Sequence, residues 1–268
     1  MEPLAESGTH FYCVRNHHFD KAKEGYANLL LANEKNSKDP GDSASMVQAR
    51  AQIFSKNFYK KPADALAALC LGFPMPIASP VIADSGCGEG YYLHEVRQAF
   101  VRQHSEPLCI GIDVSKHAIR LAARRYADSH YVVASVKKLP FSADSIDILL
   151  NIFAPRNFPE FSRTMKNEGY LIIVSPGPRH LEQLKDALAL SVEPHVEPVF
   201  DTTGTQIHQI RQEHLQDEIS LTSAEDVFHL CHMTPFWWKL SQEGRQKVAT
   251  MNHLTVTLDF VITVFQKK

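Results

Sequence analysis

The sequence predicts an α/β fold in which a doubly wound, mostly parallel sheet carries helices on both faces. From Val81 to Pro176, apolar runs of strand length alternate with helical patterns, as parallel strands joined by crossover helices require. Near the start of this region, the apolar run 80–83 leads into a glycine-rich turn and then a helical pattern over 91–102. The length of 268 residues suits one large domain with a small appendage.

The other elements of the sheet are read from their apolar patterns. Between the second and third strands, residues 116–127 place apolar residues at helical spacing, which predicts a surface helix packed on the sheet. The C-terminal segment 253–266 alternates apolar and polar residues, which is typical of a long closing strand. The second to fifth strands are expected at 108–110, 131–135, 145–153 and 170–175.

The turn after the first strand, Asp84-Ser85-Gly86-Cys87-Gly88-Glu89-Gly90, narrows the choice of ligand. A dinucleotide-binding fingerprint would need a third glycine at position 91, which is Tyr. The spacing D-x-G-x-G-x-G is that of S-adenosylmethionine (SAM) methyltransferases. Glycines at 86, 88 and 90 allow a tight turn and a close approach to the ligand. The N–H groups at the helix start suit the methionine carboxylate, and Asp84 suits the ammonium group.

A second carboxylate supports this interpretation. Asp113 follows the second strand, 23 residues after Gly90, where it would accept hydrogen bonds from both ribose hydroxyls. An ordinary glycine turn with a capping Asp is the alternative, and it explains either feature alone. The two features in register favour SAM binding.

Composition is that of a soluble enzyme, and it bears on membrane insertion, redox compartment and nucleic-acid binding. No apolar run reaches the roughly 18 residues of a membrane helix, and residues 1–10 lack the apolar segment of a signal peptide, so no membrane partner is expected. The five cysteines are scattered, which predicts a reduced, cytoplasmic protein. The net charge of −2 does not indicate nucleic-acid binding, so any RNA contact must come from a local patch.

The N-terminal part differs in texture from the rest. Residues 1–45 are polar, and the turn cluster 38–43 offers Asp42 or Ser43 as a cap for a helix that begins near Ala44. We therefore expect two domains, a small N-terminal module at 1–43 and a methyltransferase domain at 44–268.

Blocks outside the glycine loop are more specific than the loop itself. These blocks are K-E-G-Y-A-N-L-L at 23–30, D-P-G-D-S at 39–43, M-V-Q-A-R at 46–50, L-P-F-S at 139–142, S-P-G-P-R-H-L at 175–181 and M-T-P-F-W at 233–237. With them, the chain resembles the 23S ribosomal RNA guanine-N1 methyltransferases of the RlmA type from about Cys13 to the C-terminus.

The resemblance implies a class I methyltransferase, with a seven-stranded, mostly parallel sheet, that uses SAM to methylate N1 of a guanine in a hairpin loop of large-subunit ribosomal RNA. It also implies cofactor contacts from Tyr59, from Tyr92 and Leu93 after the glycine loop, and from His180. Read without the resemblance, Tyr59 is equally a residue that covers the core, and His180 is a residue at a helix start. A homodimer formed through the N-terminal module is a further hypothesis from the resemblance.

The family carries an N-terminal zinc module with a C-x-x-C pair followed by C-x-x-x-H. This sequence has Cys13 and His17 in the second half of the pattern, but it starts too late to hold the first pair. A structural zinc site needs four ligands, and His10 and His18 are the nearest substitutes. Either the start is placed too late or the module has lost its metal, so zinc is doubtful.

The sequence does not identify the catalytic base that removes the N1 proton. Asp144, Asp147 and His180 are expected near strand ends on the SAM side, although a solvated turn and a strand edge explain the two aspartates as well.

RNA contacts are expected from two regions. The segment from Arg15 to Lys61 contains nine basic and five acidic residues, with aromatic residues interleaved. This composition suits phosphate contacts and base stacking. A solvated linker face is the plain alternative. The stretch Phe236-Trp237-Trp238 suits either base stacking or an aromatic core.

Two other functions remain open at this point. A SAM enzyme acting on a small molecule would methylate without RNA. A non-catalytic RNA-binding relative would explain the incomplete zinc pattern, but such a chain would have little reason to keep both the glycine loop and Asp113.

Overall fold

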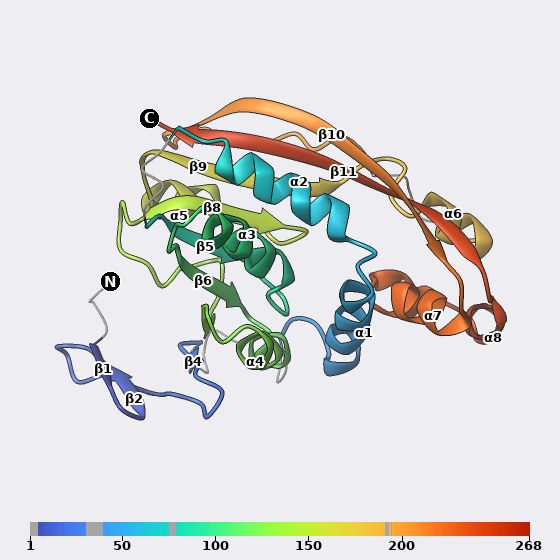
Figure 1. Ribbon diagram of the computed structural model, residues 1–268, viewed down its shortest axis with the longest axis horizontal. Helices are drawn as coiled ribbons and strands as arrows, with labels where there is room; N and C mark the ends of the chain where they lie inside the picture. Colours follow the sequence, from blue (N-terminus) through green and yellow to red (C-terminus); the bar gives the residue numbers. More distant parts are fainter. Residues whose placement is uncertain (1–4, 31–39, 75–78, 191–192, 194) are drawn as a thin grey trace.

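The computed structural model describes residues 5–30, 40–74, 79–190, 193 and 195–268, and an eight-stranded sheet forms its centre (Figure 1). The strand order is β10-β11-β9-β8-β5-β6-β7-β4. The strands are β4 (Ala27–Asn28), β5 (Val81–Ser85), β6 (Leu108–Asp113), β7 (His130–Val133), β8 (Ile146–Ile152), β9 (Met165–Pro176), β10 (Ile207–Leu221) and β11 (Leu254–Lys267).

Seven of these strands form the expected methyltransferase sheet. β5 to β9 run parallel, and β11 runs antiparallel between β9 and β10. The eighth strand, β4, is a two-residue addition from the N-terminal part, and it pairs in parallel with β7. The predicted fold class is confirmed, with this one extra strand.

Helices cover the sheet on both faces. Ile172 and Val174 of β9 join the large apolar cluster that includes residues of α1 to α4 and α7, whereas Leu171 and Ile173 join a smaller cluster with α5. This alternation is what a strand buried on both faces requires. The helices are α1 (Ala44–Ser55), α2 (Lys60–Leu71), α3 (Tyr91–Arg102), α4 (Lys116–Arg125), α5 (Phe158–Thr164), α6 (Glu182–Ala187), α7 (Ala224–His232), α8 (Gln242–Thr250) and the 3-10 helix η2 (Pro235–Lys239).

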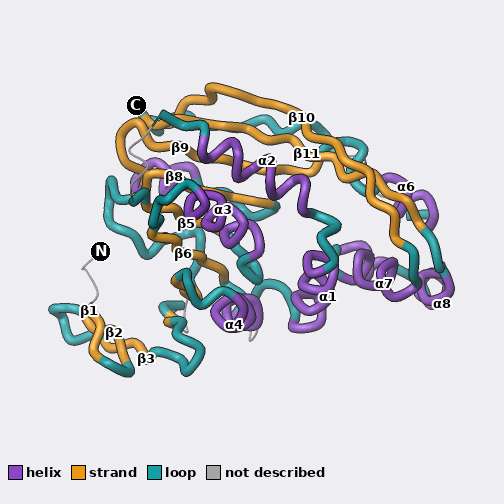
Figure 2. Tube along the Cα trace, in the orientation of Figure 1, coloured by secondary structure: helices purple, strands orange, loops and turns teal. Residues whose placement is uncertain are grey.

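The two C-terminal strands extend beyond the rest of the sheet as a two-stranded ribbon. β11 pairs with β9 only from Phe260 onward, while its first residues, 254–259, pair with β10 alone. The far end of the ribbon lies beside α7 and α8, and α1 packs against α7 (Figures 1 and 2). An ion pair of 2.5 Å between Lys56 and Asp226 joins the end of α1 to α7.

The N-terminal residues form a separate three-stranded antiparallel sheet. It consists of β1 (Ala5–Ser7), β2 (His10–Tyr12) and β3 (His18–Asp20). The chain then enters the main sheet through β4, and the N–H of Leu29 continues the pairing by donating to the carbonyl of Val133. The division into domains at 43/44 stays a prediction.

Candidate SAM-binding site

The glycine loop begins at the carboxyl end of β5 and adopts backbone angles that only glycine takes without strain. Gly86, Gly88 and Gly90 have φ of 92°, 55° and 85°. The N–H groups of Gly86 and Cys87 donate to the carbonyl of Ile112 at 2.8 and 2.9 Å, which ties the loop to the end of β6.

Two of the glycines are also required by close packing. A Cβ at Gly86 would lie 2.3 Å from the Cβ of Ala154, in the turn after β8. A Cβ at Gly90 would lie 2.7 Å from the hydroxyl of Tyr131. The loop is therefore closely packed between strand β7 and the turn that follows β8.

Asp113 holds the loop from the end of β6. Its two carboxylate oxygens accept hydrogen bonds from the N–H groups of Gly88 (3.0 Å) and Ser115 (2.8 Å). Burial raises the pKa of Asp113, and these two hydrogen bonds oppose that rise. The carboxylate lies where the sequence expects a ribose acceptor, and its binding of ribose stays a prediction.

Asp84 and Glu89 are buried carboxylates without a full set of partners. Each is 1% exposed, and Asp84 Oδ1 and Glu89 Oε2 have no hydrogen-bond partner among the described residues. Burial, and then the charges of Asp113 and Glu89, raise the pKa of Asp84 well above its usual range. Buried acceptors without donors fit the ammonium group of the methionine part of SAM. The N–H groups of all three loop glycines already donate within the protein.

Arg50 of α1 is the residue of this site that sequence reasoning missed. Its guanidinium forms an ion pair with Asp42 and lies 3.7 Å from Glu89 Oε2. The same segment is anchored to the end of β6, because the Ser115 hydroxyl donates to the carbonyl of Asp42 at 2.9 Å. The only sequence signal for Arg50 was its place in the block 46–50, which together with the block 39–43 supported the family resemblance but assigned Arg50 no role.

Tyr59, Tyr92 and Leu93 lie in or against the large apolar cluster. Tyr59 is 2% exposed, its hydroxyl has no hydrogen-bond partner among the described residues, and its ring contacts Phe54 and Phe260 edge-on. Burial raises the pKa of Tyr59 and of Tyr92. Leu93 is fully buried. The cofactor contacts expected of these three residues stay predictions.

The block P-G-P-R-H-L crosses the end of β9 and is anchored by Asp259 of β11. The Asp259 carboxylate accepts from the N–H of Arg179 at 2.9 Å, and its carbonyl accepts from the N–H of Gly177 at 2.8 Å. Gly177 is required here because a Cβ would lie 2.4 Å from Asp259 Oδ2. His180 is held in turn, since its Nδ1 accepts from the N–H of Asp259 at 3.2 Å.

His180 is a neutral imidazole in this setting. Burial, with the nearby charges of His195 and Lys185, lowers the pKa of His180 to about 3. Because Nδ1 accepts a hydrogen bond, the proton of the neutral ring is on Nε2. Nε2 therefore serves as a hydrogen-bond donor, and it is not the acceptor that a base for the N1 proton needs.

The expectation that Asp144 and Asp147 face the SAM side is wrong. Both lie at the amino end of β8, whereas the glycine loop follows the carboxyl end of the parallel strand β5. Asp147 accepts from the N–H of Val81 at 2.8 Å and pairs with Lys166, and Asp144 pairs with Lys267. These aspartates stabilise the opposite edge of the sheet.

The predicted metal ligands Cys13 and His17 lie together but form an incomplete site. Cys13 Sγ lies 3.4 Å from His17 Nδ1. Within the described residues, no group of three or more His, Cys, Asp or Glu is arranged to hold a metal ion. A structural zinc ion needs four ligands, so these residues do not fit one.

The predicted RNA-binding regions are partly occupied by internal contacts. At least five of the nine basic residues at 15–61 form ion pairs within the chain, namely Lys21, Arg50, Lys56, Lys60 and Lys61. Lys35 and Lys38 lie outside the described residues. In the aromatic stretch, Phe236 is buried but Trp238 is 57% exposed. Phosphate and base contacts from these regions stay predictions.

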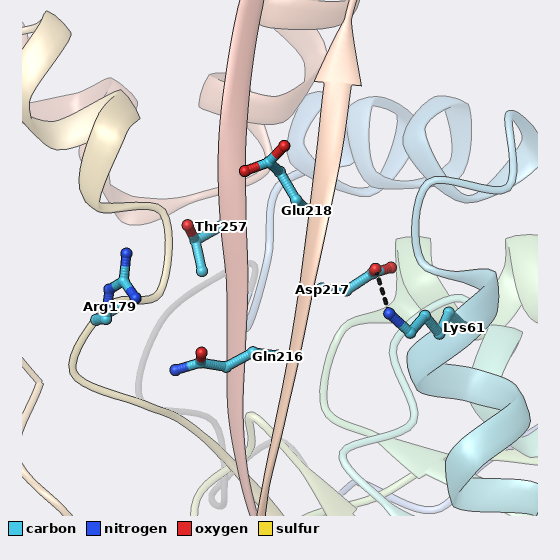
Figure 3. Close-up of a pocket in the computed structure, with 6 residues that line it drawn as sticks. All are labelled: Lys61, Arg179, Gln216, Asp217, Glu218 and Thr257. Carbon is cyan, nitrogen blue, oxygen red and sulfur yellow. Dashed lines mark hydrogen bonds and ion pairs between the residues drawn. The ribbon is translucent and has the colours of Figure 1, made fainter.

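An open pocket of about 400 Å³ lies beside the P-G-P-R-H-L block (Figure 3). Its walls come from the start of α2, the β10–β11 ribbon and Arg179. A 2.7 Å ion pair between Lys61 and Asp217 closes one side. None of the predicted cofactor-binding residues lines it; the lining residues are Lys61, Arg179, Gln216, Asp217, Glu218 and Thr257.

Comparisons with known proteins agree with this geometry. A family model described as "RlmA, N-terminal", a zinc ribbon, matches residues 1–38, and one described as "Methyltransferase domain" matches 79–227. The 23S rRNA (guanine(748)-N(1))-methyltransferase of Streptomyces fradiae is 33% identical over 267 residues, covering 98% of this chain and 92% of the relative. The chain belongs to the 23S rRNA (guanine-N1) methyltransferase family.

Two further matches extend the comparison. YxjB of Bacillus subtilis, which bears a name for the same reaction, is 30% identical over 273 residues, covering 98% of this chain and 93% of its own. A chain from the Haloferax volcanii complex between the Trm112 methyltransferase activator and a methyltransferase matches with a TM-score of 0.50 and 18% identity, over 85% of this chain and 99% of that one. This structural likeness shows the methyltransferase fold alone. In the part of the chain that the structure describes, no helix is long and apolar enough to cross a membrane.

Replacing Arg50 should destabilise the site because Glu89 would be left as a buried carboxylate without its cation. We expect Arg50→Met to lower the free energy of unfolding by about 3 kcal/mol and to weaken SAM binding. Urea denaturation and isothermal titration calorimetry measure the two effects. The double variant Arg50→Met/Glu89→Gln should recover part of the stability, and equal stability of the single and double variants would contradict the pairing.

His180 should make the protein less stable in acid. In the unfolded chain the pKa of His180 is about 6.5, so below that pH the unfolded chain binds a proton that the folded protein does not bind until about pH 3. The contribution of His180 to the free energy of unfolding is therefore fully present above about pH 6.5. As the pH falls below about 6.5, it is lost at up to about 1.4 kcal/mol per pH unit. In His180→Asn, where the amide oxygen replaces Nδ1 as acceptor, urea unfolding should depend less on pH between 6.5 and 4.5. The exposed His208→Asn is the matched control, and equal pH dependence in both variants would refute the assignment.

Proposed function

We propose that this chain transfers the methyl group of SAM to N1 of a guanine in 23S ribosomal RNA. The observation that carries the proposal is the loop at 84–90, in which two buried carboxylates lack hydrogen-bond donors among the described residues, in a member of this family. For the relative from Streptomyces fradiae, the name specifies guanine 748. A guanine in a hairpin loop is the substrate that we propose for this chain.

The residues of the site would divide the work of holding SAM. Asp84 and Glu89 offer acceptors for the ammonium group, and Asp113 offers oxygens to the ribose. When bound, SAM supplies an electrophilic methyl group on a positively charged sulfur. The acidic surroundings favour that positive charge, and Arg50 offsets part of the repulsion by lowering the pKa of Glu89 and Asp113.

The main task of the protein is then to place guanine N1 about 3 Å from the methyl carbon and in line with the sulfur. Guanine N1 carries a proton that must leave before or during attack. His180, with its proton on Nε2, suits a hydrogen bond to the guanine carbonyl, where negative charge develops as N1 loses its proton. The proton acceptor is a water or a group outside the residues named here.

Primer extension on an unmodified, full-length 23S rRNA transcript tests the proposed function. Incubation with the protein and SAM should create a reverse-transcriptase stop one nucleotide before the target, because a methyl group on N1 blocks the Watson–Crick edge. Asp84→Asn should reduce the rate at which this stop forms by at least about tenfold, since the amide cannot balance the ammonium charge. The exposed variant Asp128→Asn serves as the control.

No stop in the presence of bound SAM would contradict the proposal. Methylation of a small molecule without RNA would point to a different transferase. Binding of RNA without methylation would point to a non-catalytic relative. The cytoplasmic location and the homodimer expected from the sequence also stay predictions, and a monomer mass in light scattering would refute the dimer.

A further inference from the structure

We propose that Phe153 is the surface on which the target guanine stacks while it is methylated. This inference deepens the proposed function and rests on it. Three independent features of Phe153 carry it, namely its place at the sheet edge, its backbone conformation and its exposed ring.

Phe153 lies directly beside the glycine loop. It follows β8 at the carboxyl edge of the sheet, and its neighbour Ala154 is the residue that a Cβ at Gly86 would strike. The turn is fixed in this position by Asn151, whose Nδ2 donates to the carbonyls of Ser85 (2.9 Å) and Pro155 (3.0 Å). A group on this turn is therefore held at a set place relative to the SAM loop.

The backbone of Phe153 is in the left-handed region, with a φ of 51°. This conformation is unfavourable for a bulky side chain, and a glycine or asparagine would adopt it more readily. The N–H of Phe153 donates to the carbonyl of Val174 at 3.0 Å, which helps to hold the strained residue. A strained aromatic residue at a site edge indicates a functional reason for both the strain and the ring.

The ring of Phe153 is supported on one side and open elsewhere. Its neighbours are the buried rings of Phe260 and His180, with centroids 5.4 and 5.6 Å away. The residue is nevertheless 44% exposed, although it directly follows a buried strand. An apolar ring that core residues support from behind, and that solvent reaches from the front, has the form of a stacking platform.

The reaction needs such a platform. N1 lies on the Watson–Crick edge, so the guanine must leave its neighbours in the RNA before it reaches the methyl group. An aromatic side chain replaces the lost stacking and sets the plane of the base. Phe153 is next to the loop that would hold SAM, and His180, with its Nε2–H, is next to Phe153. Both groups can therefore act on the same base.

Aromatic and aliphatic replacements of Phe153 separate stacking from packing. Phe153→Tyr and Phe153→Trp keep a stacking ring, whereas Phe153→Leu keeps apolar bulk without one. We expect Phe153→Leu to lower kcat/KM for methylation of the 23S rRNA transcript by about 10- to 100-fold, and the aromatic variants to stay within about threefold of the wild type. SAM affinity by calorimetry and the thermal midpoint should be unchanged in all three.

Leu108→Ala is the matched control. Leu108 is 43% exposed, much as Phe153 is, but it begins β6 at the opposite edge of the sheet. The Leu108→Ala variant should retain wild-type kinetics. This result would show that loss of an exposed apolar side chain is not by itself the cause of any defect in Phe153→Leu.

Three outcomes would overturn the role of Phe153 while leaving the proposed function intact. In the first, Phe153→Leu keeps activity within threefold of the wild type. In the second, the aromatic variants lose as much activity as Phe153→Leu. In the third, SAM affinity or the thermal midpoint falls in parallel with activity, which is the result of a purely structural role. If the wild type itself methylates no RNA, the proposed function fails, and this inference fails with it.

Discussion

The carboxylate of Asp113 is the contact on which the geometry of the site depends. By accepting N–H groups from Gly88 and Ser115, it joins the glycine loop of one strand to the end of the next. Ser115 then caps α4 and also donates its hydroxyl to the carbonyl of Asp42. One partly buried carboxylate thus connects the loop, a helix start and the segment that enters α1. A change at Asp113 would move all three parts together.

The same arrangement concentrates negative charge in a place with little water. Asp113 and Glu89 raise the pKa of Asp84, Asp113 also raises that of Glu89, and Arg50 supplies a cation from α1. Such a cluster is unfavourable until positive charge enters it. In the proposed site, the ammonium and sulfonium groups of SAM would carry that charge, and cofactor binding would then be linked to the position of α1. The segment before residue 79, where the methyltransferase-domain match begins, is therefore part of the proposed site.

The sequence predicted the elements that have a local pattern of their own, such as residue spacing, an apolar run or a helix cap. The glycine loop and the buried strands follow from spacing and apolar runs, and the helix start at Ser43 follows from capping. β10 was not predicted, because its burial alternates only from Glu213 to Leu221 and acidic residues occupy some of the inward positions, which hides the apolar alternation in the sequence. Asp144 and Asp147 were misplaced although chain order decides their position, because residues at the start of a strand parallel to β5 lie at the edge opposite the glycine loop. Arg50 and the φ of Phe153 depend on contacts or conformation that spacing does not encode.

The N-terminal module is attached to the main sheet by residues other than its potential metal ligands, Cys13 and His17. Residues after Cys13 and His17 make strand-pairing, ion-pair and apolar contacts with the methyltransferase part. Ala27 and Asn28 pair with β7, and Glu24 accepts a 2.9 Å hydrogen bond from Arg120 of α4. The buried side chain of Tyr26 adds apolar contact with the large cluster. Docking of residues 24–30 thus rests on strand pairing, an ion pair and apolar packing, whereas the two potential ligands lie in the outer part with β1 to β3. A test of metal binding therefore probes that outer sheet, and the SAM site can be intact whatever its result.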